Sequence, residues 1–462
     1  MAARISETDV IIDLQGEEAP QCAHGPALMF VRYSGSNGGR RFFACSAFRD
    51  RKVCGFFKWC DEKTTKEKKE MEKMRHKSED LMYTHKQYRK RFLSFKKLPQ
   101  KERVLCRTCG LFLLPGEVKD HTKHDILSNI SNAMLKVPSK LFLPLDNNKT
   151  YAQYLFSEKT VKFVLEQLKS LNKTHVICLG APRIHEAIMN EKNETLTSFL
   201  LDLDSRYMQL YGPNHYARYN MFNHYFFDGE KSAASLTTFL DSCSHDQVAM
   251  VFDPPFGGMV EALAASLRKL SNLWRITSQA PDDASLHILW FFPYFMEKRI
   301  IDSFEDFQML DYKVDYDNHQ LFQGDVKKYG SPVRIFTNVP PHKIPLPAEE
   351  GYRFCKVCNR YSSKENVHCD VCDICPSKDG RTYKHCFQCE RCVKPNKEHC
   401  SVCKSCQLKD HNCGKPSQGC HICGALGHKR RNCPKTGTQS PAERKKKWSE
   451  DGARKKMKYT KI

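Results

Sequence analysis

The sequence predicts an α/β fold, in which a mostly parallel sheet in the middle of the chain is flanked by several small zinc-binding modules. From roughly residue 150 to 340, apolar strand-like segments alternate with amphipathic helical segments, which is typical of a sheet covered by helices. Cysteines crowd both ends of the chain with the spacing of metal ligands, and between these groups lie only Cys178 and Cys243. The formal net charge of +21 favours a polyanion such as nucleic acid as the partner.

The length and the cysteine content limit which class of protein this can be. The chain has 462 residues, enough for two or three domains with at least one large core. Its first residues show no basic region leading into an apolar one, and no apolar run approaches the length of a membrane span, about 18 residues. We therefore expect a soluble, intracellular protein with no membrane partner. Because thiols stay reduced inside cells, the 23 cysteines are expected to be metal ligands rather than disulfides.

The central α/β domain is predicted over residues 140–340. Its expected helices are residues 157–171 and 258–270, and its expected strands are residues 174–180, 197–204, 215–227, 247–256, 286–295 and 331–338. In folds of this class, ligands bind beyond the carboxyl ends of the strands. The residues that directly follow each strand are therefore the first candidates for a functional site.

The first N-terminal module, residues 15–62, contains the segment "GGRRFFACSAFRDRKVCGFFKW" and resembles the GRF-type zinc finger. Its candidate zinc ligands are Cys22, His24, Cys45 and Cys54. Their basic and aromatic neighbours are Arg40, Phe43, Phe56 and Trp59. Rings beside arginines suit stacking on unpaired bases, whereas core packing around the metal is the alternative role of these rings.

The second module, residues 63–135, is predicted to be a charged linker followed by a Cys2His2 finger. Its candidate ligands are Cys106, Cys109, His121 and His124. The two histidines are closer together than the usual gap of about three to five residues. We therefore expect a structural or docking finger rather than one whose helix reads a nucleic-acid groove. Cys60 has no partner in this scheme and is expected to be an ordinary thiol, as are Cys178 and Cys243.

The C-terminal cysteines of residues 350–415 form an internal repeat, "HCDVCDIC", "HCFQCERC" and "HCSVCKSC". An adjacent His and Cys cannot easily bind one tetrahedral ion, so we assign them to neighbouring, interleaved sites. The resulting ligand sets are Cys355, Cys358, His368, Cys375; Cys369, Cys372, His385, Cys392; Cys386, Cys389, His399, Cys406; and Cys400, Cys403, His411, Cys413. Other pairings remain open. Complete Cys3His sets leave no position for substrate and are expected to be structural.

The interleaved repeat resembles the cysteine-rich domains of protein palmitoyltransferases and of some ubiquitin ligases. The absence of apolar runs long enough to span a membrane argues against a palmitoyltransferase. A zinc knuckle follows at residues 418–435, with the candidate ligands Cys420, Cys423, His428 and Cys433. It resembles retroviral-type knuckles, which bind single-stranded RNA, although a protein-binding knuckle is the alternative. With a basic tail at residues 436–462, expected to be disordered, the scheme predicts about seven Zn²⁺ sites.

The segment "VFDPPFGG" contains the candidate catalytic residues Asp253, Pro254, Pro255 and Phe256. The lone pair of an exocyclic base amine is delocalised into the ring, so the amine is a poor nucleophile. The Asp253 carboxylate and the Pro254 carbonyl could accept hydrogen bonds from its two N–H groups and free the lone pair. The two prolines hold these acceptors in place, and Phe256 offers a face on which a flipped base can stack.

The candidate cofactor-binding residues follow the earlier strands of the same domain. Gly180, Ala181 and Pro182 end the "VICLGAP" segment, which resembles the first cofactor-binding turn of a Rossmann-like methyltransferase. The acids Asp202 and Asp204 end the second strand, where an acid accepts the ribose hydroxyls of a cofactor; Asp202 is preferred, and Asp204 could instead cap the next helix. After the third strand, Asn223 or Asp228 is expected to contact the cofactor adenine, and Asp253 borders the same site.

The order of modules resembles the zinc-knuckle-containing family of N6-adenosine methyltransferases that act on large-subunit ribosomal RNA. The resemblance covers nearly the whole chain: GRF finger, Cys2His2 finger, methyltransferase domain with DPPF, interleaved repeats and knuckle. It implies a Rossmann-like fold that uses S-adenosylmethionine, an adenosine in structured 28S-type rRNA as the target, and a nuclear or nucleolar location, with the cytoplasm also allowed. Ribosome biogenesis and translation are the processes that it implies.

Two alternatives remain open at the level of the sequence. The chain could be a zinc-rich RNA-binding adaptor with an inactive methyltransferase fold, since the turn after the first strand contains a single glycine, Gly180. It could also methylate N4 of cytosine or a glutamine amide, because loops of the DPPF type serve all three nitrogens. The RNA-binding modules favour a nucleic-acid substrate over glutamine.

Overall fold

A computed structural model describes residues 8–14, 16, 18–32, 39–48, 50–62, 81–145, 153–191, 195–318, 331–411 and 413. The predicted zinc knuckle, the basic tail and residues 63–80 of the predicted linker lie outside the described residues. Among the helices that the structure describes, none combines the length and the apolar character that a membrane crossing requires.

The centre of the molecule is an eight-stranded mixed sheet with the strand order β13-β12-β11-β10-β14-β15-β17-β16. The five inner strands from β12 to β15 are parallel, and β13, β17 and β16 add antiparallel edges. The strands are β10 (His175–Leu179), β11 (Thr197–Asp202), β12 (Tyr216–Asn220), β13 (Tyr225–Phe226), β14 (Val248–Phe252), β15 (His287–Pro293), β16 (Gln308–Met309) and β17 (Val333–Thr337). The predicted α/β fold class is therefore confirmed.

The inner strands form because both faces of the sheet are buried. In β10, Val176 and Cys178 belong to one apolar cluster, whereas Ile177 and Leu179 belong to the cluster on the opposite face. Helices α5 (Glu158–Ser170) and α6 (Pro182–Met189) contribute to the first cluster, and α8 (Glu230–Asp241) and α9 (Val260–Thr277) contribute to the second. Strands covered on both faces need apolar residues at every position, which explains their continuous apolar runs.

The prediction of one long strand over residues 215–227 is wrong. The chain reverses after β12 and returns as the short antiparallel strand β13. His224 adopts a positive φ of 58° in this reversal, a conformation that residues other than glycine rarely take. The resulting hairpin places the side chains of residues 221–224 beyond the carboxyl end of β12, at the edge of the sheet where ligands bind in such folds.

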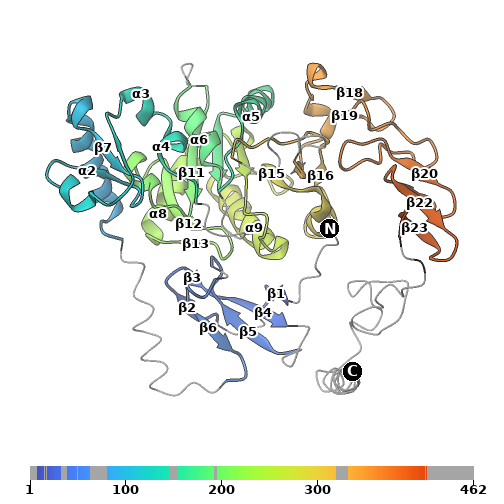
Figure 1. Ribbon diagram of the computed structural model, residues 1–462, viewed down its shortest axis with the longest axis horizontal. Coiled ribbons are helices and arrows are strands. Elements are labelled where there is room, and N and C mark those ends of the chain that lie inside the picture. The colour runs from blue at the N-terminus through green and yellow to red at the C-terminus, as the bar shows by residue number, and fades with distance from the viewer. Residues whose placement is uncertain are drawn as a thin grey trace.

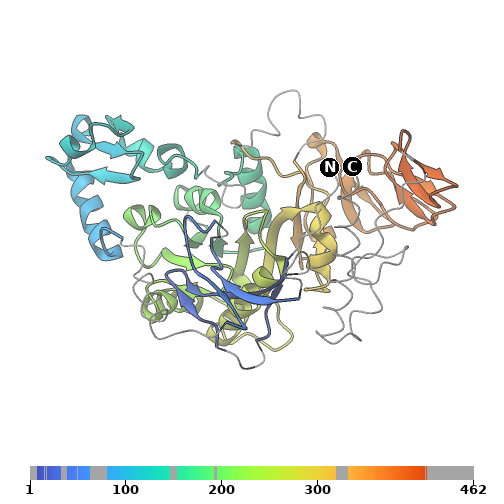
Figure 2. The same ribbon diagram turned by 60° about the horizontal axis from the view of Figure 1, so that its bottom comes forward.

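The N-terminal module is a four-stranded antiparallel sheet made of β1 (Thr8–Ile11), β4 (Leu28–Arg32), β5 (Arg41–Ala44) and β6 (Phe57–Trp59), with the hairpin β2 (Gln21–Cys22) and β3 (Gly25–Pro26). Figure 1 shows this module below the central sheet, and Figure 2 shows it in front of the sheet. Gly25 lies against β13: its φ is +91°, and an added Cβ would lie 2.4 Å from the Cγ atom of Tyr225. The first finger is thus packed against the central domain.

The Cys2His2 module consists of α2 (His85–Lys97) and a three-stranded sheet of β7 (Val104–Cys106), β8 (Leu111–Leu113) and β9 (Ile126–Ser128). A capping box between Thr84 and Gln87 begins α2. Phe92 and Phe95 of this helix and Phe112 of β8 join the same apolar cluster as the first face of the central sheet. The finger therefore shares its core with the central domain. The short helices α3 (Asn132–Leu135), α4 (Pro138–Leu141), α7 (Tyr207–Leu210) and α10 (Glu297–Ile301) complete the helices described here.

The C-terminal module is a row of three hairpins that extends away from β16 (Figure 1). The hairpins are β18 (Tyr352–Cys355) with β19 (Arg360–Ser363), β20 (Lys384–Cys386) with β21 (Arg391–Val393), and β22 (Lys397–Cys400) with β23 (Ser405–Leu408). The first hairpin is held by Asp311, whose carboxylate accepts hydrogen bonds from the Ser363 and Asn366 nitrogens at 2.8 and 2.9 Å. Only this end of the row contributes to the central core.

Candidate active site and zinc centres

A cavity of about 350 Å³ lies at the carboxyl ends of β10, β11, β12 and β14. These strands flank the point where the strand order of the sheet reverses, which is where ligands bind in open α/β sheets. The lining residues are Ala47, Phe48, Leu145, Gln153, Tyr154, Gly180, Pro182, Asp202, Leu203, Asp204, Ser205, Arg206, Arg218, Tyr219, Asn220, Met221, Phe222, Asp253, Pro254, Pro255 and Phe256. The structure thus brings together most of the side chains that the sequence singles out.

Gly180 explains why a single glycine suffices after β10. Its φ is +63°, and an added Cβ would lie 2.7 Å from the Cε atom of Met221 and 2.9 Å from the Asp253 carbonyl oxygen. Only a glycine lets the turn after β10 approach the loop after β14 this closely. Pro182 begins α6 and lines the cavity, whereas Ala181 is buried beneath the turn and does not line it.

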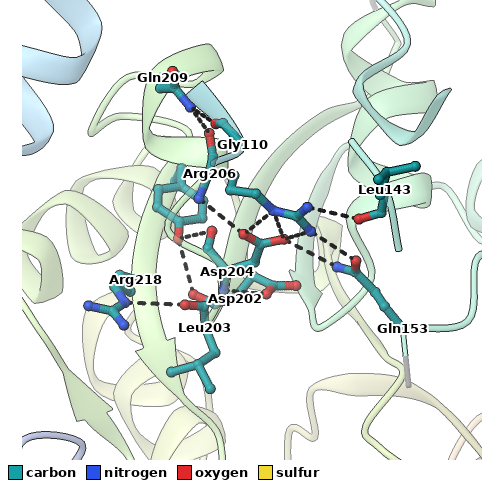
Figure 3. Close-up of polar contacts among 10 residues, drawn as sticks. Gly110, Leu143, Gln153, Asp202, Leu203, Asp204, Arg206, Gln209 and Arg218 are labelled. Atoms are coloured by element: carbon teal, nitrogen blue, oxygen red, sulfur yellow. Dashed lines mark hydrogen bonds and ion pairs between the residues drawn. The ribbon is translucent and has the colours of Figure 1, made fainter. Parts of the chain in front are cut away.

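The two acids after β11 have different partners, as Figure 3 shows. The Asp204 carboxylate forms a bidentate ion pair with Arg206, with N–O distances of 2.9 and 2.6 Å. The Asp202 carboxylate accepts a 2.9 Å hydrogen bond from the Asp204 backbone nitrogen. Burial raises the pKa of the Asp202 carboxyl to about 7, and the negative charge of Asp204 adds to the effect. Asp204 is committed to Arg206, so Asp202 is the acid better suited to a ligand.

The DPPF loop places the partly exposed carboxylate of Asp253 at the cavity. The Asp253 backbone nitrogen donates to the Leu179 carbonyl oxygen at 3.0 Å, which continues the pairing of β14 with β10. The Tyr316 hydroxyl donates to the Asp253 carboxylate at 3.0 Å. Burial raises the pKa of the Asp253 carboxyl well above its usual range, and the hydrogen bond from Tyr316 opposes this shift.

Two tyrosines of the site belong to no motif that the sequence displays. Tyr154 lines the cavity, and its ring stacks on Phe256 with a centroid distance of 5.4 Å and an interplanar angle of 16°. Tyr316 packs edge-on against Phe256 at 5.8 Å and binds Asp253. The alternation of buried apolar and polar residues before Tyr316 gives the one usable signal, because it places Tyr316 on an inward face. The loop therefore joins a carboxylate, carbonyl acceptors and an aromatic surface.

Asn223 is held by the N-terminal finger. Its side-chain nitrogen donates to the carbonyl oxygens of His24 and Pro26 at 3.0 and 2.8 Å and lies 2.8 Å from the Ser46 hydroxyl. The side chain that the sequence assigns to the cofactor adenine thus lies against the finger and does not line the cavity. The exposed Asp228 follows β13 and is also outside the lining.

The finger reaches the cavity through Ala47 and Phe48. The Phe48 backbone nitrogen donates to the Cys45 sulfur at 3.3 Å. Its ring packs edge-on against the His24 imidazole, with 4.5 Å between the centroids. Both contacts are to predicted zinc ligands, so the position of Phe48 depends on the geometry of the metal site.

The aromatic residues of the finger divide into two groups. Phe43 and Phe56, which the sequence offers for base stacking, are buried with exposed fractions of 6% and 9% and belong to the finger core. Trp59 stays partly exposed, and the Arg40 guanidinium lies 4.0 Å from its ring centroid. Three further partly exposed rings, Phe30, Phe42 and Phe57, continue this surface. Phe43 and Phe56 thus take the alternative role of core packing, and the partly exposed rings differ from those expected, except for Trp59.

The structure gathers the predicted zinc ligands of the two N-terminal fingers into two clusters. In each cluster all ligand atoms lie within 4.8 Å of one another: Cys22, His24, Cys45 and Cys54, and Cys106, Cys109, His121 and His124. Ligands of a tetrahedral zinc site lie about 3.3 to 3.8 Å apart, given bonds of about 2.0 Å to nitrogen and 2.3 Å to sulfur. The sulfur of Cys45 and the Nδ1 atom of His24 are 3.4 Å apart. The donor sets therefore fit Zn²⁺.

The interleaved C-terminal sites also assemble with the predicted partition. Three clusters fall within the same 4.8 Å limit: Cys355, Cys358, His368, Cys375; Cys369, Cys372, His385, Cys392; and Cys386, Cys389, His399, Cys406. At the end of the row, the Cys403 sulfur and the Cys413 sulfur lie 3.4 and 2.9 Å from the His411 Nε2 atom. Every cysteine that the structure describes is free of disulfides, as metal ligation requires. Cys420, Cys423, His428 and Cys433 lie outside the described residues.

Comparisons with known proteins agree with this geometry. Residues 147–338 match the model of a family described as probable N6-adenine methyltransferase, and residues 20–63 match the GRF zinc finger. The human rRNA N(6)-adenosine-methyltransferase ZCCHC4 is 48% identical over 434 residues, which cover 92% of this chain and 84% of the human protein. The mouse protein of the same name is 49% identical over 427 residues (91% and 83%), and that of Xenopus tropicalis is 48% identical over 424 residues (90% and 87%). The chain belongs to this family of rRNA N(6)-adenosine-methyltransferases.

Proposed function

We propose that the protein transfers the methyl group of S-adenosylmethionine to N6 of an adenosine in large-subunit ribosomal RNA. The observation that carries the proposal is the position of the DPPF loop: Asp253 borders the cavity directly beside the glycine turn of Gly180. The family membership and the printed names of the relatives support the choice of adenosine and of ribosomal RNA.

Gly180, Asp202 and the end of β12 are the residues that would hold the cofactor. Gly180 lines the cavity without a side chain, so the methionine part would lie close to its backbone, and the Asp202 carboxylate would accept hydrogen bonds from the ribose hydroxyls. When bound, S-adenosylmethionine supplies an electrophilic methyl group attached to a cationic sulfur. The protein residues hold the reacting nitrogen in line with that group and exclude water from the cavity.

Asp253 acts on the amine of the target adenine. Its carboxylate and the Pro254 carbonyl accept hydrogen bonds from the two N–H groups, so that less of the nitrogen lone pair is delocalised into the ring. The Tyr316 hydroxyl holds the carboxylate in place by donating a hydrogen bond to its Oδ1 atom at 3.0 Å. Phe256, already stacked on Tyr154, provides the aromatic surface for a base that has left its own stack.

The proposal is tested by methyl transfer from labelled S-adenosylmethionine to fractionated total RNA, followed by mass analysis of the nucleosides. We expect label in N6-methyladenosine from large-subunit rRNA. Asp253→Asn should lower kcat by about 100-fold or more, because one of the two acceptors becomes a weaker, neutral one. RNA affinity should stay nearly unchanged. Label in N4-methylcytosine, or an equal loss of activity and RNA affinity, would contradict the assignment.

We also propose that the partly exposed rings Phe30, Phe42, Phe57 and Trp59 of the finger stack on unpaired bases of the RNA. Arg40 and Arg51 lie over two of these rings, at 4.0 and 3.8 Å from the centroids, and Arg40 also forms an ion pair with Asp61 at 2.7 Å. The charge of +21 supports the same role.

We infer from a target in large-subunit rRNA that the protein acts in the nucleus and the nucleolus, and that it serves ribosome biogenesis and hence translation. The net positive charge of the chain is compatible with that location. Microscopy of a fluorescent fusion beside a nucleolar marker tests the location, and an exclusively cytoplasmic signal would contradict it.

A further inference from the structure

We propose that the N-terminal finger forms one wall of the cofactor site, with Phe48 contacting the adenine of bound S-adenosylmethionine and Asn223 docking the finger as a positioning residue. The inference rests on the proposed use of this cofactor and adds a binding residue from outside the methyltransferase domain. Its starting observation is that Ala47 and Phe48 line the same cavity as Asp202 and Asp253.

The strand order determines which part of the cofactor lies near the finger. Asp253, Gly180, Asp202 and Asn220 stand at or directly after the ends of β14, β10, β11 and β12, which are neighbours in this order. Successive strands are about 4.8 Å apart, so these residues form a row across the sheet edge. With the methyl group between Asp253 and Gly180 and the ribose on Asp202, the adenine falls at the end of β12.

The finger contacts the sheet at that end of the row. Leu203, which directly follows the ribose-binding Asp202, packs against the apolar core of the finger. The Asn220 side-chain nitrogen donates to the His24 carbonyl oxygen at 2.8 Å and lies 2.8 Å from the Ser46 hydroxyl. Phe48 follows Ser46 by two residues and lines the cavity, so its ring closes the adenine end. An aromatic ring suits the flat, apolar face of adenine.

Phe48 is fixed from two sides. On the side of the metal site, its backbone nitrogen binds the Cys45 sulfur and its ring packs against His24. On the side of the sheet, Ser46 lies 2.8 Å from the side-chain nitrogens of both Asn220 and Asn223. The wall is therefore held in place before the cofactor binds, which keeps the entropic cost of ordering it low.

The direct test is calorimetric titration of the full-length protein with S-adenosylhomocysteine. Phe48→Ala should raise the dissociation constant by about tenfold, as expected for the loss of one base-stacking ring. The matched control is Phe387→Ala: Phe387 packs on the zinc-ligand candidate His385 at 4.8 Å, just as Phe48 packs on His24, but it is 76% exposed and far from the cavity lining. This control should bind S-adenosylhomocysteine like the wild type.

Asn223→Asp provides the test of docking. The change replaces the donor nitrogen by a carboxylate oxygen that faces the carbonyl oxygens of His24 and Pro26. Because Asn223 does not line the cavity, weaker binding of S-adenosylhomocysteine in this variant reports a displaced finger. A free energy of unfolding that falls while the dissociation constant stays at the wild-type value would overturn the positioning role.

The remaining outcomes are also decisive. An unchanged dissociation constant in Phe48→Ala with a raised KM for RNA would overturn the inference, because Phe48 would then contact the target instead. If Phe48→Ala loses zinc, Phe48→Tyr and Phe48→Leu carry the test: the tyrosine should retain affinity and the leucine should not. Failure of the wild-type protein to bind S-adenosylhomocysteine would contradict the proposed function itself, whereas a defect confined to the variants supports the wall.

Discussion

At the scale of single residues, the carboxyl groups of Asp253 and Asp202 have different surroundings. Asp253 lies in an apolar loop and accepts a hydrogen bond from the Tyr316 hydroxyl. Asp202 lies beside the acid Asp204, whose negative charge is partly offset by the positive charge of Arg206. Both carboxyls accept hydrogen bonds from a ligand more strongly when they are ionised, and burial raises the pKa of both. Their titration should therefore be visible in catalysis and in cofactor binding.

Tyr316→Phe should move the acid limb of the pH–kcat profile to higher pH. The hydroxyl stabilises the ionised Asp253, so its removal raises the pKa of Asp253 further and lowers the ionised fraction at a given pH. A hydrogen bond to a charged group is worth enough to shift the limb by about one pH unit. Tyr312→Phe is the control, since Tyr312 is buried on the same segment without contacting Asp253. Identical profiles for both variants would show that Tyr316 does not act on the carboxylate.

Binding of S-adenosylhomocysteine should weaken as the pH falls through about 7. The pKa of Asp202 is about 7, so the carboxylate that accepts the ribose hydroxyls is ionised above this value and protonated below it. Titrations between about pH 6 and 8.5 should show up to about a tenfold loss of affinity per pH unit on the acid side. Asp202→Asn should bind weakly at every pH, and a pH dependence that survives this change would assign the titration to another group.

At the scale of elements, the Cys2His2 finger supports the loop that carries both acids. The side chain of Gln209 in α7 donates to the Gly110 carbonyl oxygen at 2.7 Å (Figure 3). It also accepts a hydrogen bond from the Phe112 backbone nitrogen at 3.0 Å. Gly110 has a φ of +64°, and an added Cβ would lie 2.4 Å from the Cδ atom of Arg206. The finger thus packs against Arg206, which forms the ion pair with Asp204. The Asp204 backbone nitrogen in turn donates to the Asp202 carboxylate.

Gln209→Ala should lower both the stability of the protein and its affinity for S-adenosylhomocysteine. The change leaves two buried backbone groups without partners, at a cost of about 1–3 kcal/mol each. Gln100→Ala is the control, because Gln100 makes an exposed hydrogen bond to Asn129 in the same finger. A lower Tm with unchanged cofactor affinity would show that Gln209 serves stability alone.

Sequence patterns could predict the elements that are marked by a local pattern of residues. Strands such as β10 and β14 are buried on both faces, so each is a continuous apolar run, and the zinc ligands recur at spacings set by the metal. The contacts of Asn223 and Tyr316 could not be predicted, because their partners are distant in the sequence. Asn223 binds a finger nearly two hundred positions earlier in the chain, and Tyr316 meets Asp253 across 63 residues. Such pairs depend on packing, which no local pattern records.

At the scale of the whole molecule, the zinc modules differ in how they connect to the central cavity. The N-terminal finger contributes lining residues, and the Cys2His2 finger shares the core of the sheet. The C-terminal row joins the core through its first hairpin and then extends away from it (Figure 1). Loss of metal should therefore affect the cofactor differently at the two ends of the chain.

Cys45→Ser and Cys389→Ser test this difference, because each removes one ligand from one cluster. Both variants should lose about one zinc equivalent per chain, since a structural site needs all four ligands. Cys45→Ser should also weaken S-adenosylhomocysteine binding by about tenfold, because Phe48 loses the sulfur that its backbone nitrogen binds, and His24, on which its ring packs, loses the metal that fixes it. Cys389→Ser should leave this binding unchanged, because its cluster contributes no residue to the cavity lining. Equal losses of cofactor affinity would mean that the modules stabilise the central domain as one unit, and the wall formed by the finger would then have no separate role.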